Sequence, residues 1–265
     1  MADRQSGAKR PTKAERKDQA RRDREQIQRK MAARSRNRKL GTALIGLAVV
    51  VIVVAVVLTQ AGGSGLPTPD QLQAQAAAQE KAAGCSAVQQ TPNYLNAPGP
   101  DPDVDHVHIG SSAAFQTPPA LSTYPTVPPA SGPHNPTPAA PGVYSSPPDI
   151  YQAIHSLEHA GVIIWYAPEA ADSDAVRQIR EFYDRPTSDI NVGQAKVIVA
   201  PYDYPAQGAQ GHLPPKVQMA LVAWHYLQTC AQPNLAAAFN FSSQYSNGYP
   251  NAPYLGRARE PNLPL

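Results

Sequence analysis

Hydrophobic and polar positions follow helical and strand-like patterns in the second half of the chain. Apolar residues recur at i, i+3, i+4 and i+7 from Ile150 to Leu157. This spacing predicts an amphipathic helix, capped by Asp149 and ended by Gly161. The uncharged run over residues 161–167 then predicts a buried strand. The same patterns predict further helices over 172–185 and 235–246, the latter opened by Asn234, and further strands over 196–201 and 217–224.

The stretch from residue 89 to residue 148 is dense in proline and glycine. Because proline lacks an amide donor and restricts φ, we expect irregular loops laid over a core built elsewhere. Residues 60–69 predict a flexible linker. The Ala-rich stretch that follows predicts a helix, capped by Asp70 and ended by Gly84, and it is too polar for a core. We interpret it as a stalk or a partner-facing helix.

The longest apolar run is Leu40–Leu58, which contains no charged residue. As a helix it would be about 28 Å long, which is enough to cross a bilayer. We therefore predict a transmembrane helix that acts as an uncleaved signal anchor. A cleaved secretory signal is the alternative, but its apolar region is shorter and its basic flank is not as long.

Charge is distributed unevenly on the two sides of this run. Residues 1–39 hold 15 Lys/Arg and 5 Asp/Glu, whereas residues 40–265 hold 8 and 15. The positive-inside rule therefore predicts a single-pass protein of the cell membrane, with a cytoplasmic basic arm and an extracytoplasmic C-terminal domain. The arm has no aromatic residue to stack on bases, so we expect no nucleic-acid partner and contact with lipid instead.

These elements predict an α+β fold, with a small mixed or antiparallel sheet, a few helices and long Pro-rich loops, preceded by one transmembrane helix. The predicted organisation is a basic arm (1–39), the transmembrane helix (40–58), a linker with the Ala-rich helix (59–83), the α+β domain (84–250) and an extended tail (251–265).

The chain contains two cysteines, Cys85 and Cys230, and both follow the predicted anchor. In an oxidising compartment an isolated pair most simply forms one disulfide, which would contribute roughly 4 to 5 kcal/mol to stability because it closes a long loop. Two unpaired buried thiols are the alternative.

All seven histidines also follow the anchor, and two of them, His155 and His159, lie four residues apart in the predicted helix. Such a pair projects from one helix face and can bind one metal ion if further ligands come from elsewhere. Loops offer His106, His108 and His134 as these ligands. Imidazole ligands without thiolates favour Cu(II) or Zn(II).

The stretch H-S-L-E-H also matches the H-x-x-E-H pattern of inverted zinc peptidases, in which the glutamate, here Glu158, activates water. Such an enzyme needs an acidic ligand on a later helix, for which Glu181 is the candidate. A purely structural imidazole pair at a helix C-terminus is the other alternative. For His212 and His225 we expect structural or surface roles. No G-x-S-x-G motif or phosphate-binding glycine loop occurs.

Several motifs occur in a characteristic order across residues 84–231. They are Cys85, His106-Val107, S-G-P-H-N-P around His134, Gly142-Val143-Tyr144, H-S-L-E-H-A-G, and Ala223-Trp224 leading to Cys230. In this order the chain resembles a bacterial family of membrane-anchored domains of unknown function, numbered 3105. Ala160 is either an insertion before Gly161 or a replacement of the glycine usual in that family. The resemblance groups His134, His155, Glu158 and His159, but it implies no reaction.

We therefore expect an extracytoplasmic site that binds a divalent Cu or Zn ion and serves metal handling. Its predicted ligands are His106, His108, His134, His155 and His159, with Glu158 and Tyr151, one helical turn earlier, as residues that orient them. An accessory subunit of a larger membrane protein complex is the first alternative function. A zinc-dependent hydrolase is the second, and we favour a protein that is not an enzyme.

Overall fold

The computed structural model describes residues 65–185, 196–247 and 258–265. The predicted basic arm and the apolar run Leu40–Leu58 lie outside these residues, so the transmembrane helix stays a prediction. Within the described part of the chain, no helix is both long and apolar enough to span a membrane. Residues Leu66–Leu265 form one compact unit, to which everything below refers.

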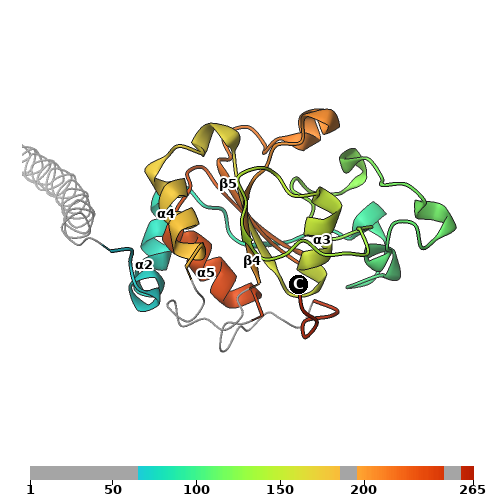
Figure 1. Cartoon of the computed structure of the whole chain (residues 1–265), viewed down its shortest axis with the longest axis horizontal. Coiled ribbons are helices and arrows are strands. Elements are labelled where there is room, and N and C mark those ends of the chain that lie inside the picture. The colour runs from blue at the N-terminus through green and yellow to red at the C-terminus, as the bar shows by residue number, and fades with distance from the viewer. Residues whose placement is uncertain (1–64, 186–195, 248–257) are drawn as a thin grey trace, which may run out of the picture. The chain divides into compact units, whose positions relative to one another are not determined.

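A six-stranded mixed sheet, counted over the described residues, forms the centre of this unit, with the order β1-β6-β5-β3-β4-β2 (Figure 1). In the middle, β3 runs parallel to β4 and antiparallel to β5. The strands are β1 (Gln89–Gln90), β2 (Gly142–Val143), β3 (Val162–Tyr166), β4 (Val197–Pro201), β5 (Met219–Ala223) and β6 (Tyr226–Cys230). The predicted α+β class with a mixed sheet is confirmed.

Both faces of the sheet are covered, which explains why the central strands have no polar positions. All five residues of β3 are buried. Val162, Ile164 and Tyr166 point into one core, and Ile163 and Trp165 point into the other. A strand with two buried faces has a continuous apolar sequence instead of an alternating one.

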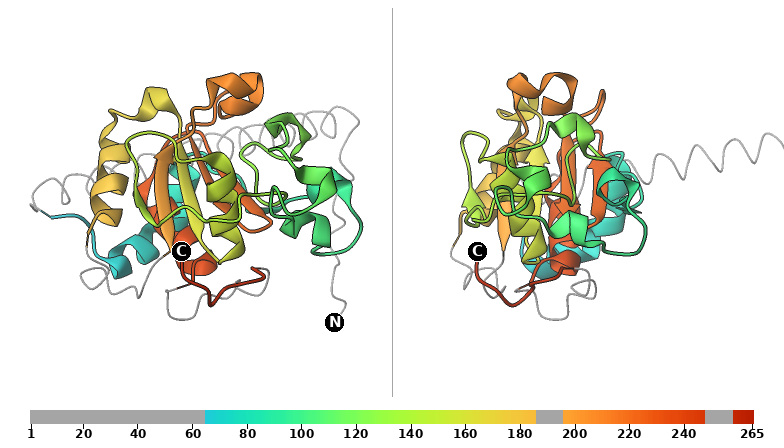
Figure 2. Two further views of the ribbon diagram at one scale, coloured as in Figure 1. Left: turned by 45° about the vertical axis from the view of Figure 1, so that its right-hand side comes forward. Right: turned by 90° about the vertical axis from the view of Figure 1, so that its right-hand side faces the viewer.

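Three helices cover one face of the sheet, and a fourth covers the other (Figures 1 and 2). The first face carries α2 (Pro69–Ala82), α4 (Asp174–Tyr183) and α5 (Leu235–Tyr245). The second face carries α3 (Ile150–Glu158), which is the helix with the histidine pair. The histidine pair, and with it the candidate site, is therefore on the α3 side of the sheet.

Helix α2 differs from the predicted stalk because it packs on α5. Its cap is Thr68, whose side chain accepts a hydrogen bond from the Gln71 amide, and not Asp70. Leu72 is buried in the first core. Hydrogen bonds between amide side chains complete the contact, including one from Asn234 Nδ2 to Gln79 Oε1 at 3.0 Å. Helix α2 therefore packs on α5 along one side through Leu72 and these amide pairs, while most of its other residues are exposed.

The Pro-rich half does more than cover a core that other elements build. Tyr94, Leu121 and Tyr124 are buried and form part of the second core beneath α3. Short 3-10 helices interrupt the loops here and elsewhere, at Tyr94–Asn96, Asp103–His106, Ala113–Phe115, Leu121–Thr123, Pro168–Ala170 and Pro205–Gly211. The expectation of irregular backbone holds, but the loops supply large aromatic side chains to the interior.

A disulfide joins Cys85, just after α2, to Cys230 at the end of β6. The bond spans 145 residues of sequence, and Cys230 is buried in the first core. The predicted pairing is confirmed. The bond fastens the end of α2 to the sheet.

The turn that follows α3 contains an alanine at a position that favours glycine. Ala160 has a φ of 59°, in the left-handed region, and Gly161 could not carry a side chain because a Cβ there would meet Ser156 O at 2.5 Å. Left-handed backbone costs alanine more than glycine.

We expect Ala160→Gly to raise the free energy of unfolding by about 0.5 to 1 kcal/mol, since the end of a helix favours a left-handed glycine. Urea unfolding followed by tryptophan fluorescence can test this, because both tryptophans of the chain, Trp165 and Trp224, are buried in this unit. Gly161→Ala is the matched comparison and should destabilise the protein. A loss of stability in Ala160→Gly would contradict this account of the helix end.

Candidate metal centre

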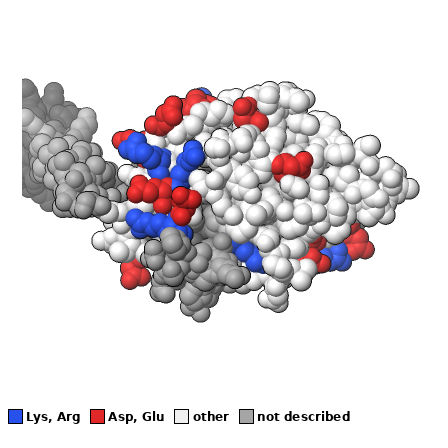
Figure 3. Space-filling model, in the orientation of Figure 1, with Lys and Arg blue, Asp and Glu red and all other residues white. Residues whose placement is uncertain are grey.

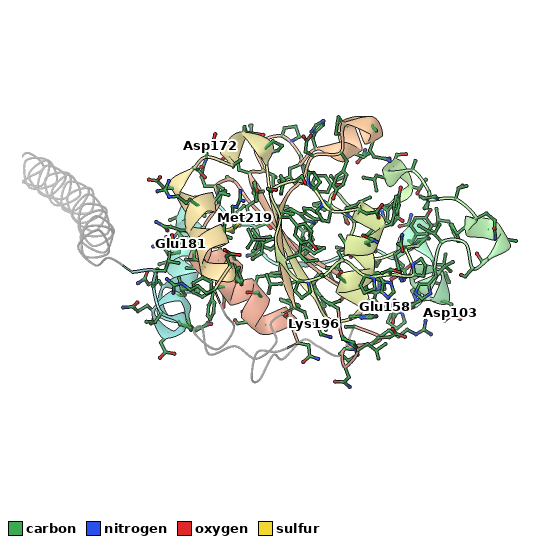
Figure 4. All side chains as sticks on the ribbon, viewed as in Figure 1. Asp103, Glu158, Asp172, Glu181, Lys196 and Met219 are labelled. Carbon is green, nitrogen blue, oxygen red and sulfur yellow. A yellow bond between two sulfur atoms is a disulfide. The ribbon has the colours of Figure 1, made fainter. Side chains whose placement is uncertain are left out.

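The C-terminal end of α3 carries three functional side chains. Asp149 caps the start of the helix by accepting hydrogen bonds from two backbone amides. His155, Glu158 and His159 then occupy the last turn and the residue after it, and all three are buried. Figure 4 shows Glu158 and Lys196 near the lower edge of the view. Charge and imidazole are thus concentrated in an interior that is otherwise apolar.

A rigid loop brings His134 to this helix end. Gly132 has a φ of 116°, and a Cβ there would lie 2.7 Å from the Tyr124 ring, so the position requires glycine. The Asn135 amide donates to Tyr151 O on α3 at 3.1 Å. On the other side, His134 and the segment containing His108 form a β-bridge. These contacts fix His134 between α3 and His108.

Three of the histidines have the same hydrogen-bonding arrangement. Nδ1 of His134 lies 2.8 Å from Gly132 O, Nδ1 of His155 lies 2.6 Å from Asn135 O, and Nδ1 of His159 lies 2.8 Å from Pro264 O. A carbonyl oxygen can only accept, so Nδ1 carries the proton in each ring. In the neutral form each ring therefore presents Nε2 as a lone-pair donor, as metal-binding histidines do.

These Nε2 atoms converge on one another and on carboxylates. Two groups have ligand atoms that all lie within 4.8 Å of each other. We name them the inner group (His108, His134, His155 and Glu158) and the outer group (His155, His159 and Glu260). Nε2 of His155 lies 3.0 Å from Nε2 of His159 and belongs to both groups.

His134 is the histidine whose surroundings most clearly favour a cation. Its Nε2 is buried and makes no hydrogen bond in the described structure. Glu158 Oε2 lies 3.0 Å away, near enough for an ion pair but not aligned as a hydrogen bond. Two electron-rich atoms at this distance repel each other unless a positive charge lies between them or beside them. A metal ion or a proton would satisfy both.

His106 has a different role from the predicted one. Its Nδ1 bonds to Glu158 Oε1, and its Nε2 bonds to Asp101 Oδ1 at 2.7 Å. Burial opposes a charge on this ring, but the hydrogen bond with Glu158 and the charge of Asp101 outweigh it, so the pKa of His106 is raised. With both nitrogens occupied, His106 holds Glu158 in place and is not among the grouped ligand atoms, which corrects our expectation.

Burial and neighbouring groups keep His108, His155 and Glu158 in the protonation states that a cation requires. Burial and the neighbouring His134 ring lower the pKa of His155 to about 4, so this imidazole is neutral at pH 7. Burial and His134 also lower the pKa of His108. Burial alone would raise the pKa of Glu158, but the hydrogen bond with His106 and the nearby His134 hold it well below its usual range. The site thus offers neutral imidazoles beside an ionised carboxylate.

The C-terminal residues contribute groups that the sequence patterns did not indicate. Glu260 Oε2 lies 3.1 Å from His159 Nε2. The buried Lys196, whose pKa burial lowers, donates to the carbonyls of His159 at 2.8 Å, Pro261 at 3.0 Å and Leu263. These bonds fasten the tail to the end of α3. The predicted tail (251–265) is therefore part of the site over its described residues, 258–265.

Glu181, the expected acidic ligand of a zinc peptidase, lies elsewhere. It is on α4, which covers the opposite face of the sheet from α3, and Figure 4 shows it far from Glu158. On the face drawn in Figure 3, charged side chains gather over α4, and Glu181 lines a hollow there with Arg177 and Arg180. The peptidase ligand set that the sequence predicted is not assembled.

A family model described as "Protein of unknown function (DUF3105)" matches residues 119–259, which is more than half of the chain. The chain belongs to the DUF3105 family. No curated protein and no solved structure matched the chain.

The DUF3105 match contains most of the candidate site. His134, His155, Glu158 and His159 lie within the matched residues, whereas His108 precedes them and Glu260 directly follows them. Tyr151 is also inside the match, but its hydroxyl donates to Pro119 O and not to an imidazole. Tyr151 therefore supports the site through its backbone carbonyl, which holds the amide next to His134.

The two remaining histidines of this DUF3105 domain lie apart from the grouped ligands. His212 is half exposed, with Asp203 Oδ1 at 3.5 Å. His225 is buried at the turn between β5 and β6, with Nε2 3.2 Å from Asp101. These positions agree with the surface and structural roles expected from the sequence, and they make His212 a suitable control in experiments.

Proposed function

We propose that this DUF3105 domain binds one divalent cation, Cu(II) or Zn(II), through the inner group. The observation that supports this most directly is the buried Nε2 of His134, which has no hydrogen bond and points into a cluster of neutral imidazoles and one carboxylate. A carbonyl oxygen fixes the tautomer of His134 and of His155. In metal sites, the groups around a ligating histidine fix its tautomer and its ring orientation in the same way.

The donor set narrows the choice of ion. Nitrogen and carboxylate ligands suit Zn(II) and Cu(II), whereas Cu(I) sites use thiolate or thioether sulfur. Both cysteines are committed to the disulfide, and the one methionine in the described residues, Met219, is buried in the first core. These facts support a divalent ion.

We further propose that the domain serves metal handling outside the cytoplasm, anchored by Leu40–Leu58. The disulfide supports an oxidising compartment, since such bonds persist there and are rare in a reducing cytosol. The apolar run and the basic arm before it support a single-pass topology with the N-terminus in the cytoplasm.

The two alternative functions have less support. As a hydrolase, the protein would need Glu158 as a general base, but Glu158 is held by His106 and its pKa is depressed, which disfavours proton uptake. As an accessory subunit, it would offer a partner the anchor, α2 and the tail, but α2 packs on α5 along one side and the described part of the tail docks on Lys196. Membrane lipid remains the partner we propose.

Metal content tests the proposal. We expect the full-length chain, purified in mild detergent, stripped with a chelator and reloaded with Zn²⁺ or Cu²⁺, to retain about one ion after desalting, as a single closed site would. His134→Ala and His155→Ala should lose most of this ion, because each removes a ligand. Elemental analysis is the measurement.

Two further variants show whether the loss of metal is specific to the inner group and is not a result of misfolding. His212→Ala removes a half-exposed histidine far from the grouped ligands and should retain the ion. His108→Gln removes a ligand that is only partly buried, so it tests the site even if a variant of the fully buried His134 does not fold. An unloaded wild-type chain, or equal metal content in wild type and His108→Gln, would refute the proposal.

A further inference from the structure

His155 is shared by two ligand groups that differ in their access to solvent. Its Nε2 lies 3.9 Å from Glu158 Oε2 on one side and 3.0 Å from His159 Nε2 on the other. The inner and outer groups are thus neighbours with one ligand in common.

The shared ligand can serve only one group at a time. Nδ1 of His155 donates to Asn135 O, so this ring has a single nitrogen available to a metal ion. Neither group can therefore be complete while the other holds an ion through His155. The arrangement favours successive occupation over two ions bound together.

The groups differ in how deeply they lie. In the inner group, the side chains of His134 and Glu158 are 0% and 4% exposed. In the outer group, the side chain of Glu260 is 41% exposed, while that of His159 is 7% exposed. Each group has one partly exposed member, which is the imidazole of His108 in the inner group and the carboxylate of Glu260 in the outer group. Because a carboxylate attracts a cation more strongly than a neutral imidazole does, an ion arriving from water would meet Glu260 first.

Glu260 is held in position and is not merely a surface carboxylate. Its backbone amide donates to Glu158 O at 3.1 Å. The tail around it is fixed by Lys196, which donates to two tail carbonyls, and by Pro264 O, which accepts from His159 Nδ1. The same contacts therefore position both ligands that the outer group does not share.

We infer that the outer group is an entry site for the cation and that His155 passes the ion from it to the inner group. The inference rests on the proposed function. The inner group offers four ligands, three of them buried, whereas the outer group offers three ligands with one half exposed. The ion therefore rests in the inner group, and Glu260 and His159 govern how fast it enters and leaves.

Zinc kinetics of the full-length chain in mild detergent test this inference, with Zn²⁺ alone as the ligand and a fluorescent zinc chelator as the indicator. Glu260→Gln should slow both loading and release on the order of tenfold, because a carboxylate in the entry path attracts the cation and stabilises it while it passes in either direction. Its equilibrium dissociation constant should stay near the wild-type value. Glu169→Gln, a matched change at an exposed carboxylate elsewhere, should change neither rate.

The outcomes separate this inference from the proposed function. His108→Gln, in the inner group, should weaken equilibrium binding by about tenfold to a hundredfold, on the scale of a disturbed metal site. If Glu260→Gln weakens binding as much as His108→Gln does, then Glu260 is a resident ligand and the entry site is refuted. Rates in Glu260→Gln equal to those in Glu169→Gln would also refute it. A wild-type chain that takes up no zinc would instead refute the proposed function.

Discussion

Replacing both Cys85 and Cys230 with alanine is expected to lower the free energy of unfolding by about 5 kcal/mol, because the disulfide restricts a very long loop in the unfolded chain. The bond spans 145 residues. It also holds the end of α2 against β6, so the loss should appear as one unfolding event for the whole compact unit. Urea unfolding followed by fluorescence of Trp165 and Trp224 measures it.

Reduction of the wild-type chain provides the control for this experiment. A reductant should lower the stability of the wild type to that of the double variant and should leave the variant unchanged. A loss below about 1 kcal/mol would mean that the unfolded chain gains little freedom when the bond is removed. The loop-entropy explanation would then be wrong for this protein.

His106→Ala is expected to cost about 3 to 5 kcal/mol of the free energy of unfolding, because it removes the hydrogen-bond partner of Oε1 in the buried carboxylate of Glu158. The side chains of His106 and Glu158 are only 5% and 4% exposed. The effect should be larger than that of an ordinary truncation, since the same ring also bonds to Asp101. Urea unfolding of the metal-free chain is the measurement, so that metal binding does not contribute.

Two further variants show whether the unpaired charge causes the loss. His212→Ala removes a half-exposed imidazole and should change stability by less than about 0.5 kcal/mol. In His106→Ala with Glu158→Gln, the second change removes the unpaired charge, so the double variant should lose less than the sum of the single losses. An effect of His106→Ala no larger than that of His212→Ala would contradict the role we assign to this ring.

Sequence patterns correctly predicted those helices and strands that are buried in the same way along their whole length. The apolar spacing of α3 and the uncharged run of β3 each reflect burial against a sheet or between two layers, so these elements were predicted within a few residues. Strand β6 was missed because Tyr226 and Thr229 are only partly buried and its pattern is mixed. The packing of α2 was missed because Asn and Gln side chains pair across it, and their sequence resembles that of a solvent-exposed helix.

Sequence spacing could relate only those residues of the candidate site that lie close together in the chain. Helical spacing placed His155 beside His159, and the structure brings His134 and His108 to them. The role of His106 depended on Asp101 and Glu158, which lie 5 and 52 residues away in the sequence. Glu260 lies 101 residues from His159, and no local pattern relates the two. Such pairs follow from the folded path of the chain and not from spacing.

The position of Glu260 in the chain also sets the order in which the site is assembled during synthesis. Residues 258–265 are made after every strand of the described sheet and after α3 and α5. The tail contacts are therefore the last contacts of the site for which both partners exist. We expect a protein shortened to residue 257 to lack the carboxylate that we assign to metal entry, and to leave the buried Lys196 without two of its carbonyl partners.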